Sequence, residues 1–437
     1  MKISPKTLIE KIPFYDSLVL PYHKLQAFRA ATKYDYPASG LKVIGVTGTN
    51  GKTTTCFMIH RMLNEAGLKT GLMTTVAYGV GNEIKPQVEH MTTVSAGLLN
   101  RRIREITDAG AKYLVLELTS HAMAQFRAFG VPIDIAVMTN VTHEHLDYHK
   151  TFERYVSAKR KLFRQANRTR GGKKIGVINA DDPSAELFAS DVDSPLTYGI
   201  KHGDLQARQI KLLSGGVDYF VKYNGRRLHI KTKLPGEFNV YNSLAAVAVG
   251  VSYGLTDEQI EKGIAALDSV EGRMNRVDEG QDFAVVVDYA HTPDAFEKLF
   301  SSVRAEGQVI ALFGSAGGRR DPSKRGPQGE IAGKYADVVI VTEEDDRDTP
   351  GEEILEQIAR GAEKSGKVRD RDLFLIPNRT DAIEFAFKKA RKGDLVLLLG
   401  KGNEKSIERA DGEHPWDETE TARKILRSKI STSYKRP

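Results

Sequence analysis

Residues 47–55 have the residue types and spacing of a phosphate-binding loop. They read Thr-Gly-Thr-Asn-Gly-Lys-Thr-Thr-Thr and stand between an apolar run and a helix-like run. Gly48 and Gly51 lack side chains, so backbone N–H groups can point at phosphate oxygens beside the positive end of a helix. Lys52 could reach the terminal phosphates of a nucleotide, and the Thr53 hydroxyl could ligate Mg²⁺.

The match to the general phosphate-loop pattern is incomplete. The pattern places its first glycine five residues before Gly51, where this chain has Val46, and Gly45 lies one place early. A glycine-rich turn without a ligand is the alternative interpretation. The order of strand, Gly-Lys-Thr and helix favours phosphate binding.

Carboxylates and histidines follow two other strand-like runs. Glu117 ends the apolar run 114–116, at the edge of a parallel sheet where ligands bind, and Mg²⁺ takes carboxylate oxygens. Residues 140–149 add three histidines and two acids whose spacing fits no zinc pattern. We therefore expect a magnesium-phosphate site in which His145 binds metal or orients a carboxylate or water.

Two further residues carry weak signals. Lys159 lies in a helix-like segment, where spacing alone favours an ordinary exposed cation. Asp288 follows a strand-like run and precedes a helix that starts near Asp294. Its carboxylate could bind a ribose hydroxyl or a phosphate-bound water.

The elements that must position these residues alternate between strand and helix. From Leu41, nearly continuous apolar runs separated by helical segments predict a mostly parallel sheet, with strands at Val43–Val46, Tyr113–Leu118, Ile133–Met138 and Ile175–Ile178. Turn residues within 205–234 predict antiparallel hairpins. A second series predicts strands at Ala284–Val287, Val309–Phe313, Val338–Val341, Phe374–Ile376 and Leu395–Leu399.

The predicted fold class is α/β. We expect a short N-terminal segment over 1–40, in which Tyr22–Thr32 looks weakly helical and Pro21 acts as a breaker. A central phosphate-loop ATPase domain with a parallel sheet and a small antiparallel β insert would span 41–271. A Rossmann-like, doubly wound domain would span 272–437.

Composition restricts the setting of the protein. The chain has 437 residues and one cysteine, Cys56, so an intramolecular disulfide is impossible and a reducing cytoplasmic setting fits. No apolar run approaches the roughly 18 residues of a membrane span. The net charge is +7, but the tail 422–437 carries six basic residues and no acid, which leaves +1 elsewhere. We expect a monomer that acts on small molecules and binds neither nucleic acid nor membrane.

The ordered motifs resemble those of the Mur ligase family over about residues 41–420. Within the family, they are most similar to the members that add a third residue to UDP-N-acetylmuramoyl-dipeptide. The segments that carry the resemblance are 48–53, 117–121, 139–149, 155–159, 236–242, 272–274, 288–294 and 400–404.

The resemblance implies an ATP-dependent amide ligase of peptidoglycan precursor synthesis. In such enzymes a substrate carboxylate attacks the γ-phosphate of ATP, and an amine then attacks the acyl phosphate. Two Mg²⁺ ions would be held with the help of Thr53, Glu117, His145 and Lys159. Lys159 falls at the position of a carbamylated lysine in relatives, and Lys52, His145 and Lys159 would be catalytic.

The resemblance also implies binding residues. The nucleotide would contact Gly48, Thr49, Asn50, Gly51, Lys52, Thr53, Thr54, Asn242, Arg273 and Asp288. The muramoyl peptide would contact Thr92, Thr93, Ser120 and Arg127. The incoming amino acid would contact Arg320, Asp345, Arg347, Gly400 and Glu404.

The incoming amino acid stays open between meso-diaminopimelate and L-lysine. Relatives that add meso-diaminopimelate carry Asp-Asn-Pro-Arg where this chain has Glu-Asp-Asp-Arg at 344–347. Arg347 could clamp a distal carboxylate, which favours meso-diaminopimelate. The extra acids Glu343, Asp345 and Asp346 could instead favour a basic acceptor. Because Arg347 and an ammonium-binding Glu404 together suit an amino acid with both groups at its far end, we expect meso-diaminopimelate rather than lysine.

The main departure from the family lies before the phosphate loop. Relatives have a complete N-terminal domain that grips the uridine nucleotide, whereas about forty residues precede the loop here. The short segment or a partner protein could supply that function, or the substrate could lack UDP. Two other functions stay open: a folylpolyglutamate-type or other poly-amino-acid ligase, and a non-catalytic ATP-binding module.

Overall fold

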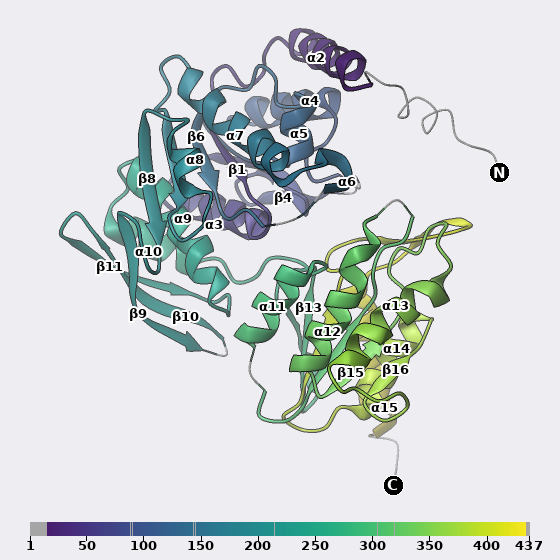
Figure 1. Ribbon diagram of the computed structural model, residues 1–437. Helices are drawn as coiled ribbons and strands as arrows, with labels where there is room; N and C mark the ends of the chain where they lie inside the picture. Colours follow the sequence, from purple (N-terminus) through teal and green to yellow (C-terminus); the bar gives the residue numbers. More distant parts are fainter. Residues whose placement is uncertain are drawn as a thin grey trace. The chain divides into compact units, whose positions relative to one another are not determined.

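The computed structural model describes residues 15–433 except 88, 90, 143, 145, 214, 304 and 319. The chain forms two compact units (Figure 1). The first contains most of the chain up to Ala266, and the second contains the chain from Leu267 together with 211–218 and 232–239. Within the described residues, no helix is both long and apolar enough to cross a membrane.

The first unit is built on an eleven-stranded sheet in the order β11-β10-β9-β8-β7-β6-β1-β5-β2-β3-β4. Its strands are β1 (Lys42–Thr47), β2 (Thr70–Met73), β3 (Ala77–Val80), β4 (Glu83–Pro86), β5 (Tyr113–Glu117), β6 (Ile133–Met138), β7 (Ile175–Asn179), β8 (Ser194–Gly199), β9 (Leu205–Leu213), β10 (Gly216–Tyr223) and β11 (Arg226–Thr232). β1 pairs in parallel with both β5 and β6. The four strands predicted here from apolar runs are confirmed.

Helices follow these strands. They are α2 (Tyr15–Lys33), α3 (Lys52–Glu65), α4 (Ala96–Asp108), α5 (Ser120–Ala124), α6 (Leu146–His149), α7 (Phe152–Arg168), α8 (Ala185–Ala189), α9 (Phe238–Ser252) and α10 (Asp257–Ala265). α7 buries Tyr155, Lys159, Leu162 and Phe163. A helix with one buried face beside a parallel sheet is the packing expected of an α/β unit.

Strands β9 to β11 are consecutive neighbours at one end of the sheet order, and β9 pairs in parallel with β8, so this insert extends the main sheet. One local prediction differs from the structure. Helix α2 continues through Pro21, so this proline is no breaker. A proline inside a helix costs about 3 kcal/mol, and burial of Ala27 and Ala31 in the second half of α2 helps to offset that cost.

The second unit contains a six-stranded sheet in the order β12-β13-β17-β14-β15-β16. Its strands are β12 (Asn275–Val277), β13 (Ala284–Asp288), β14 (Val309–Phe313), β15 (Val338–Val341), β16 (Leu373–Leu375) and β17 (Leu395–Leu399), and β18 (Ser406–Arg409) and β19 (Gly412–Pro415) form a hairpin. β12 is antiparallel and the other pairings in the six-stranded sheet are parallel.

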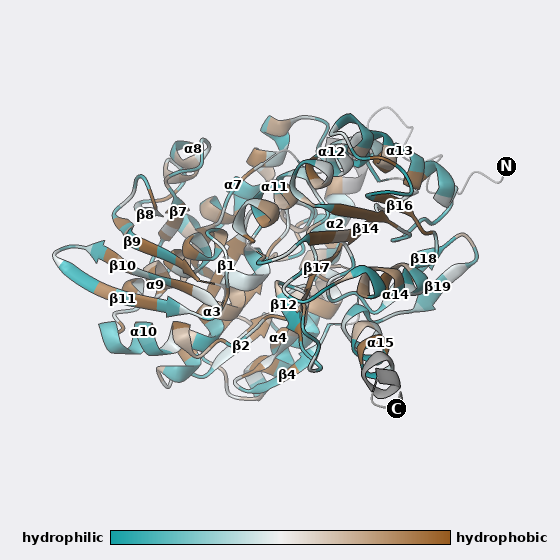
Figure 2. Ribbon diagram, turned by 90° about the horizontal axis from the view of Figure 1, so that it is seen from below, coloured by the Kyte–Doolittle hydropathy of each residue, from teal (hydrophilic) through white to brown (hydrophobic). Residues whose placement is uncertain are grey.

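Two apolar cores lie against this sheet, as a doubly wound fold requires. One core includes residues of α11 (Pro293–Ser302), α12 (Arg325–Tyr335) and α13 (Gly351–Lys364), and the other includes residues of α14 (Arg379–Lys389) and α15 (Glu418–Ser433). A short 3₁₀ turn, η1 (Pro322–Lys324), precedes α12. Figure 2 shows apolar residues concentrated in strands such as β14 and β16.

Candidate active site

The phosphate loop connects β1 to α3. Gly51 caps the start of α3 with φ 82°, and Gly48 has φ 151°, both in the region that favours glycine. A Cβ atom at Gly48 would collide with Thr139 Oγ1, and one at Gly51 would collide with Asn242 Oδ1. Both glycines are therefore required by the backbone conformation and by close neighbours.

The residues after β6 hold this loop in place. The Asn140 side chain accepts from Asn50 N at 3.0 Å and donates to Asn50 O at 3.0 Å. Thr139 Oγ1 donates to the same carbonyl at 2.6 Å, and Thr49 N donates to Asn140 O at 2.8 Å. Asn140 is not among the predicted site residues, although an amide at the end of the neighbouring parallel strand is a usable signal.

Thr53 and Glu117, two of the predicted metal ligands, lie together. Thr53 Oγ1 donates to Glu117 Oε2 at 3.0 Å, and Thr75 donates to the same oxygen through N at 3.0 Å and Oγ1 at 3.1 Å. Glu117 is 2% exposed. Within the described ranges, no three His, Cys, Asp or Glu side chains form a metal cage. The Glu117 carboxylate and the Thr53 hydroxyl instead suit a Mg²⁺ ion that is also bound by phosphate oxygens.

Lys159 is 1% exposed, so its interpretation from spacing as a surface cation is wrong. Its Nζ donates to Gly48 O at 2.5 Å and lies 4.5 Å from the centre of the Tyr155 ring. Burial, and secondly the charge of Lys52, lower the pKa of Lys159 well below its usual value. His145, the fourth predicted ligand, lies outside the described residues.

Lys52 lies over its own loop and donates from Nζ to Thr49 O at 2.8 Å. Thr54 is buried in the first turn of α3. Asn242, on α9, accepts from Thr55 Oγ1 at 3.3 Å, which places it against the same turn. The predicted nucleotide residues of the first unit thus surround one helix N-terminus.

Tyr155 connects α7 to the phosphate loop, and its removal gives a first prediction. Its hydroxyl is 3.0 Å from Thr49 Oγ1, which also accepts from Thr142 N at 2.9 Å. Tyr155→Phe should weaken Mg-ATP binding about fivefold, because one buried hydrogen bond contributes about 1 kcal/mol. Isothermal titration calorimetry measures the change.

A matched control for this variant is Tyr253→Phe. Tyr253 donates to Asp134 Oδ2 at 2.8 Å, and Asp134 belongs to β6. Its replacement should leave the affinity for Mg-ATP unchanged. Equal affinities for Tyr155→Phe and the wild type would contradict the assigned role of Tyr155.

The predicted muramoyl-peptide residues gather beside the end of β5. Thr93 Oγ1 donates to Glu117 O at 2.9 Å and accepts from Thr119 N at 3.1 Å. Arg127 donates to Thr93 O and to the Gln125 side chain. Ser120 Oγ lies 3.0 Å from His149 Nε2, and Thr92 is half-buried next to Thr93. Burial lowers the pKa of the Arg127 guanidinium.

A second group of predicted residues lies in the second unit. We call Glu344, Asp345, Arg347, Lys401, Glu404 and Glu408 the charge cluster. Lys401 is fully buried and donates to Asp345 Oδ1 at 2.8 Å and Glu404 Oε2 at 2.6 Å. Arg347 donates to Glu408 Oε2 at 2.8 Å and to Asp345 Oδ2 at 3.3 Å. Although burial opposes ionisation, Lys401 holds the pKa of Asp345 below its usual value.

Glu344 is the member of this cluster with an unsatisfied oxygen. It is 6% exposed, and its Oε2 has no hydrogen-bond partner in the described part of the chain. A Cβ atom at position 400 would lie only 2.6 Å from Glu344 Oε2, and Gly400 has φ 99°. Both observations explain why this position is a glycine. Neither Glu344 nor Lys401 was predicted as a site residue, because burial is needed to single them out.

Arg273, Asp288 and Arg320 border the charge cluster. Asp288 ends β13 and accepts from Met274 N and Ala290 N, each at 2.7 Å, so its carboxylate orders two loops. The Arg273 guanidinium lies 4.4 Å from the centre of the Tyr289 ring, whose hydroxyl donates to Glu404 Oε1 at 3.2 Å. Arg320 is exposed.

Comparison with known proteins gives consistent matches along the chain. Residues 46–250 match the model described as Mur ligase middle domain, and residues 272–402 match that described as Mur ligase, glutamate ligase domain. UDP-N-acetylmuramyl-tripeptide synthetase of Roseiflexus sp. (strain RS-1) is 43% identical over 411 residues, 91% of this chain and 81% of that protein.

Two further proteins match most of this chain. UDP-N-acetylmuramoyl-L-alanyl-D-glutamate–2,6-diaminopimelate ligase of Geobacillus kaustophilus (strain HTA426) is 39% identical over 393 residues, 89% of this chain and 79% of that protein. A solved structure of a ligase with the same name has a TM-score of 0.63 and 28% identity, and covers 95% of this chain and 84% of its own.

Proposed function

Because the chain belongs to the Mur ligase family, we propose that it adds the third amino acid to UDP-N-acetylmuramoyl-L-Ala-D-Glu. The chain is an ATP-dependent amino-acid ligase of peptidoglycan synthesis. The observation that carries the finer proposal is the similarity, at 43% and 39% identity over about nine-tenths of the chain, to relatives named as tripeptide-forming ligases. The phosphate loop locked by Asn140, with Thr53 and Glu117 in contact beside it, supports the ATP chemistry.

The proposed chemistry has two steps. A carboxylate oxygen of the glutamate attacks the γ-phosphorus of ATP, the bond to ADP breaks, and an acyl phosphate forms. The acceptor amine then attacks the acyl carbon, loses a proton, and expels phosphate. Lys52 and the amides after Gly51 stabilise the negative charge of the transferring group. Two Mg²⁺ ions, when bound by Thr53, Glu117, His145 and modified Lys159, would neutralise further phosphate charge.

We propose that Lys159 carries a carbamate in the active enzyme. Burial supports this modification, because it favours the neutral amine, which is the nucleophilic form. The amine adds to the carbon of CO₂ and releases one proton, and the product is an anionic oxygen ligand beside Gly48. Conversion of the amine to an anion also replaces the unfavourable interaction of Lys159 with Lys52 by an attractive one.

The charge cluster supports an acceptor of the lysine type. Four carboxylates face two cations, Lys401 and Arg347, so the cluster has a net charge of −2. The pairing of Arg347 with Asp345 and Glu408 weakens the case for a clamp on a distal carboxylate. The buried Glu344, whose Oε2 has no hydrogen-bond partner in the described part of the chain, adds negative charge that favours an ammonium group nearby. We therefore propose a diamino monocarboxylic acid in preference to meso-diaminopimelate.

The second prediction tests both the function and the acceptor. ADP release with UDP-N-acetylmuramoyl-L-Ala-D-Glu should show a kcat/KM for L-lysine or L-ornithine about 100-fold above that for meso-diaminopimelate, because a carboxylate facing an acidic cluster costs several kcal/mol. Turnover with meso-diaminopimelate alone would refute the acceptor assignment. A product screen by mass spectrometry that found only glutamylated folate would refute the function.

A further inference from the structure

Helix α2 gathers exposed apolar side chains in one short stretch of the first unit. Eleven large apolar side chains are exposed among the described residues, and five of them lie between Leu20 and Tyr36. Within α2 the exposed fractions are 36% for Leu20, 57% for Tyr22, 47% for Leu25 and 48% for Phe28. Single exposed apolar residues are normal, whereas a group of them in one place marks a surface that contacts something else.

The helix has two apolar faces, and only one of them is packed. α2 contacts α4 (Figure 1), and the side chains that it buries are small: Ala27, Ala30 and Ala31. Pro21, Leu25 and Phe28 recur at intervals of four and three residues, so they form a line along another side of the helix. A helix that is apolar on two sides is normally covered on both. Leu25 and Phe28 stay about half exposed, so this second face is available to a partner outside the described chain.

Cations border this apolar line on both sides. Lys24 lies four residues before Phe28, and Arg29 lies four residues after Leu25, so each is next to the line on the helix surface. Both cations are exposed, and residues 17–34 contain no acid. The apolar face of α2 therefore has a positive border.

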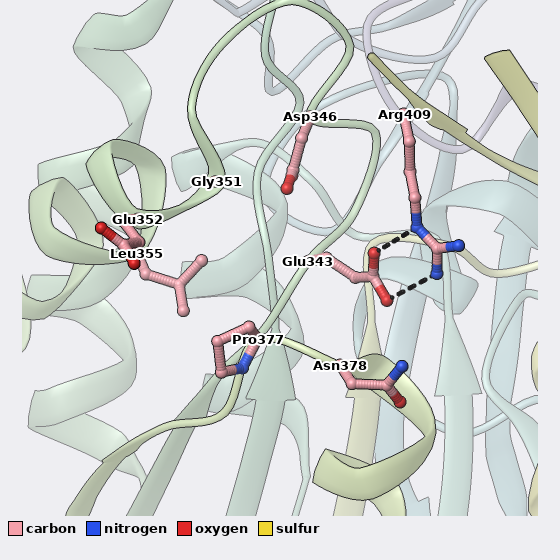
Figure 3. Close-up of a pocket in the computed structure, with 8 residues that line it drawn as sticks. All are labelled: Glu343, Asp346, Gly351, Glu352, Leu355, Pro377, Asn378 and Arg409. Atoms are coloured by element: carbon pink, nitrogen blue, oxygen red, sulfur yellow. Dashed lines mark hydrogen bonds and ion pairs between the residues drawn. The ribbon is translucent and has the colours of Figure 1, made fainter. Parts of the chain in front are cut away.

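The second unit shows the usual alternative, in which charges are paired within the chain. In a pocket that Glu343 and Arg409 help to line, Arg409 donates to the carboxylate from Nε at 2.8 Å and from Nη2 at 3.0 Å (Figure 3). Arg409 is thus neutralised by this chain, whereas Lys24 and Arg29 stand in a segment without acids.

The mixture of aromatic and basic side chains continues from α2 to α7. The loop 126–131 lies between the two helices, because the Phe129 ring centre is 6.1 Å from that of Phe28, and Lys161 Nζ is 5.3 Å from the centre of the Phe126 ring. Lys161 and Phe126 therefore extend this surface beyond α2.

These features favour an anionic lipid surface as the partner. In a symmetric pair of copies, the cations of one α2 would face those of the other, and like charges at a contact oppose association. An acidic protein would need a groove that fits a convex helix, since every residue of α2 from Leu20 on is exposed except His23 and the three alanines. A lipid surface needs no such fit, because apolar and aromatic side chains enter between the headgroups and cations contact the lipid phosphates.

We propose that α2 attaches the protein peripherally to an anionic membrane surface. Leu25 and Phe28 insert at the level of the headgroups, and Lys24 and Arg29 contact lipid phosphates. Such an attachment is independent of the ligase reaction. It differs from the expectation of no membrane contact, which followed from the length of apolar runs and the charge of the whole chain. Those two properties describe spanning segments and mean charge, but not a local face of one helix.

The third prediction concerns sedimentation of the full chain with lipid vesicles. Vesicles of equal parts phosphatidylglycerol and phosphatidylcholine should bind it, more weakly as salt is added, and vesicles of phosphatidylcholine alone should bind it about tenfold less. Leu25→Ser combined with Phe28→Ser should weaken the binding about tenfold, because two half-exposed apolar side chains no longer leave water. Lys24→Gln combined with Arg29→Gln should weaken it about as much, but only on the anionic vesicles.

The matched control is Leu212→Ser combined with Val368→Ser. These apolar side chains are 48% and 46% exposed and lie elsewhere on the chain, so the control should bind vesicles as the wild type does. Because all the substituted side chains are exposed, each variant should keep its Tm within about 2 °C. ADP release without vesicles should also be unchanged in every variant.

Several results would overturn the attachment to lipid. One is no binding to the anionic vesicles, and another is full binding by the variant that lacks both Leu25 and Phe28. A dimer in analytical ultracentrifugation that this variant dissociates, without vesicle binding by the wild type, would assign the face to a second copy. Binding of polyglutamate in place of vesicles would assign it to an acidic protein. ADP release is measured separately, so a failure of the proposed function is distinguishable from a failure here.

Discussion

Lys52→Ala is expected to reduce ATP-dependent product formation by about 10³-fold. The Lys52 ammonium lies at the start of α3 and contacts Thr49 O at 2.8 Å, so it stays over the phosphate loop. Charge on the transferred phosphoryl group is spread over its oxygens, and a preorganised ammonium there stabilises it without rearrangement. Its loss should lower kcat and also weaken ATP binding.

The measurement is ADP release together with calorimetry of Mg-ATP binding. Lys52 makes its contact on a half-exposed loop, so the variant should change Tm by less than about 2 °C. Lys42→Ala is the matched control, because Lys42 begins β1 and so lies at the opposite end of the same strand. Unchanged turnover in Lys52→Ala would refute the phosphate role of the loop.

Local sequence determined the parts of the site that could be predicted. The phosphate loop lies within nine residues, and its strand and helix are adjacent in the chain. Fully buried parallel strands such as β15 and β17 appear as continuous apolar runs. Since carboxyl ends of parallel strands share one edge, the position of Glu117 near the loop followed from topology.

Contacts between distant segments could not be predicted in the same way. Thr75 reaches Glu117 across 42 residues, and Lys401 reaches Asp345 across 56. The spacing of apolar residues in the sequence predicts which face of a helix or strand is buried. It does not predict which polar side chains from distant segments will contact one another on that face. The spacing of residues around Lys159 predicted an exposed side chain, whereas the structure buries it. Only the resemblance to the family indicated that this lysine has a special role.

Lys159→Ala is expected to lower product formation by about 10²–10³-fold, because it removes the proposed anionic ligand beside the phosphate site. Lys159→Arg should not restore activity. Arginine keeps a positive charge and forms no carbamate under these conditions, and its larger head must fit a position that is 1% exposed. Short carboxylic acids added to Lys159→Ala should recover part of the rate, because they return an oxygen anion to the vacated space.

The modification itself has a direct signature. Protein incubated with ¹³C-labelled bicarbonate should give a carbamate carbon signal by NMR that is absent from Lys159→Ala. The matched control is Lys161→Ala, two residues along α7, where the side chain lies against Phe126 and the carbamate signal should persist. The rate should also fall when CO₂ is removed and return when bicarbonate is added. A wild-type enzyme that keeps full activity without CO₂ and gives no such signal would show that Lys159 acts as the unmodified amine, held by Gly48 O at 2.5 Å.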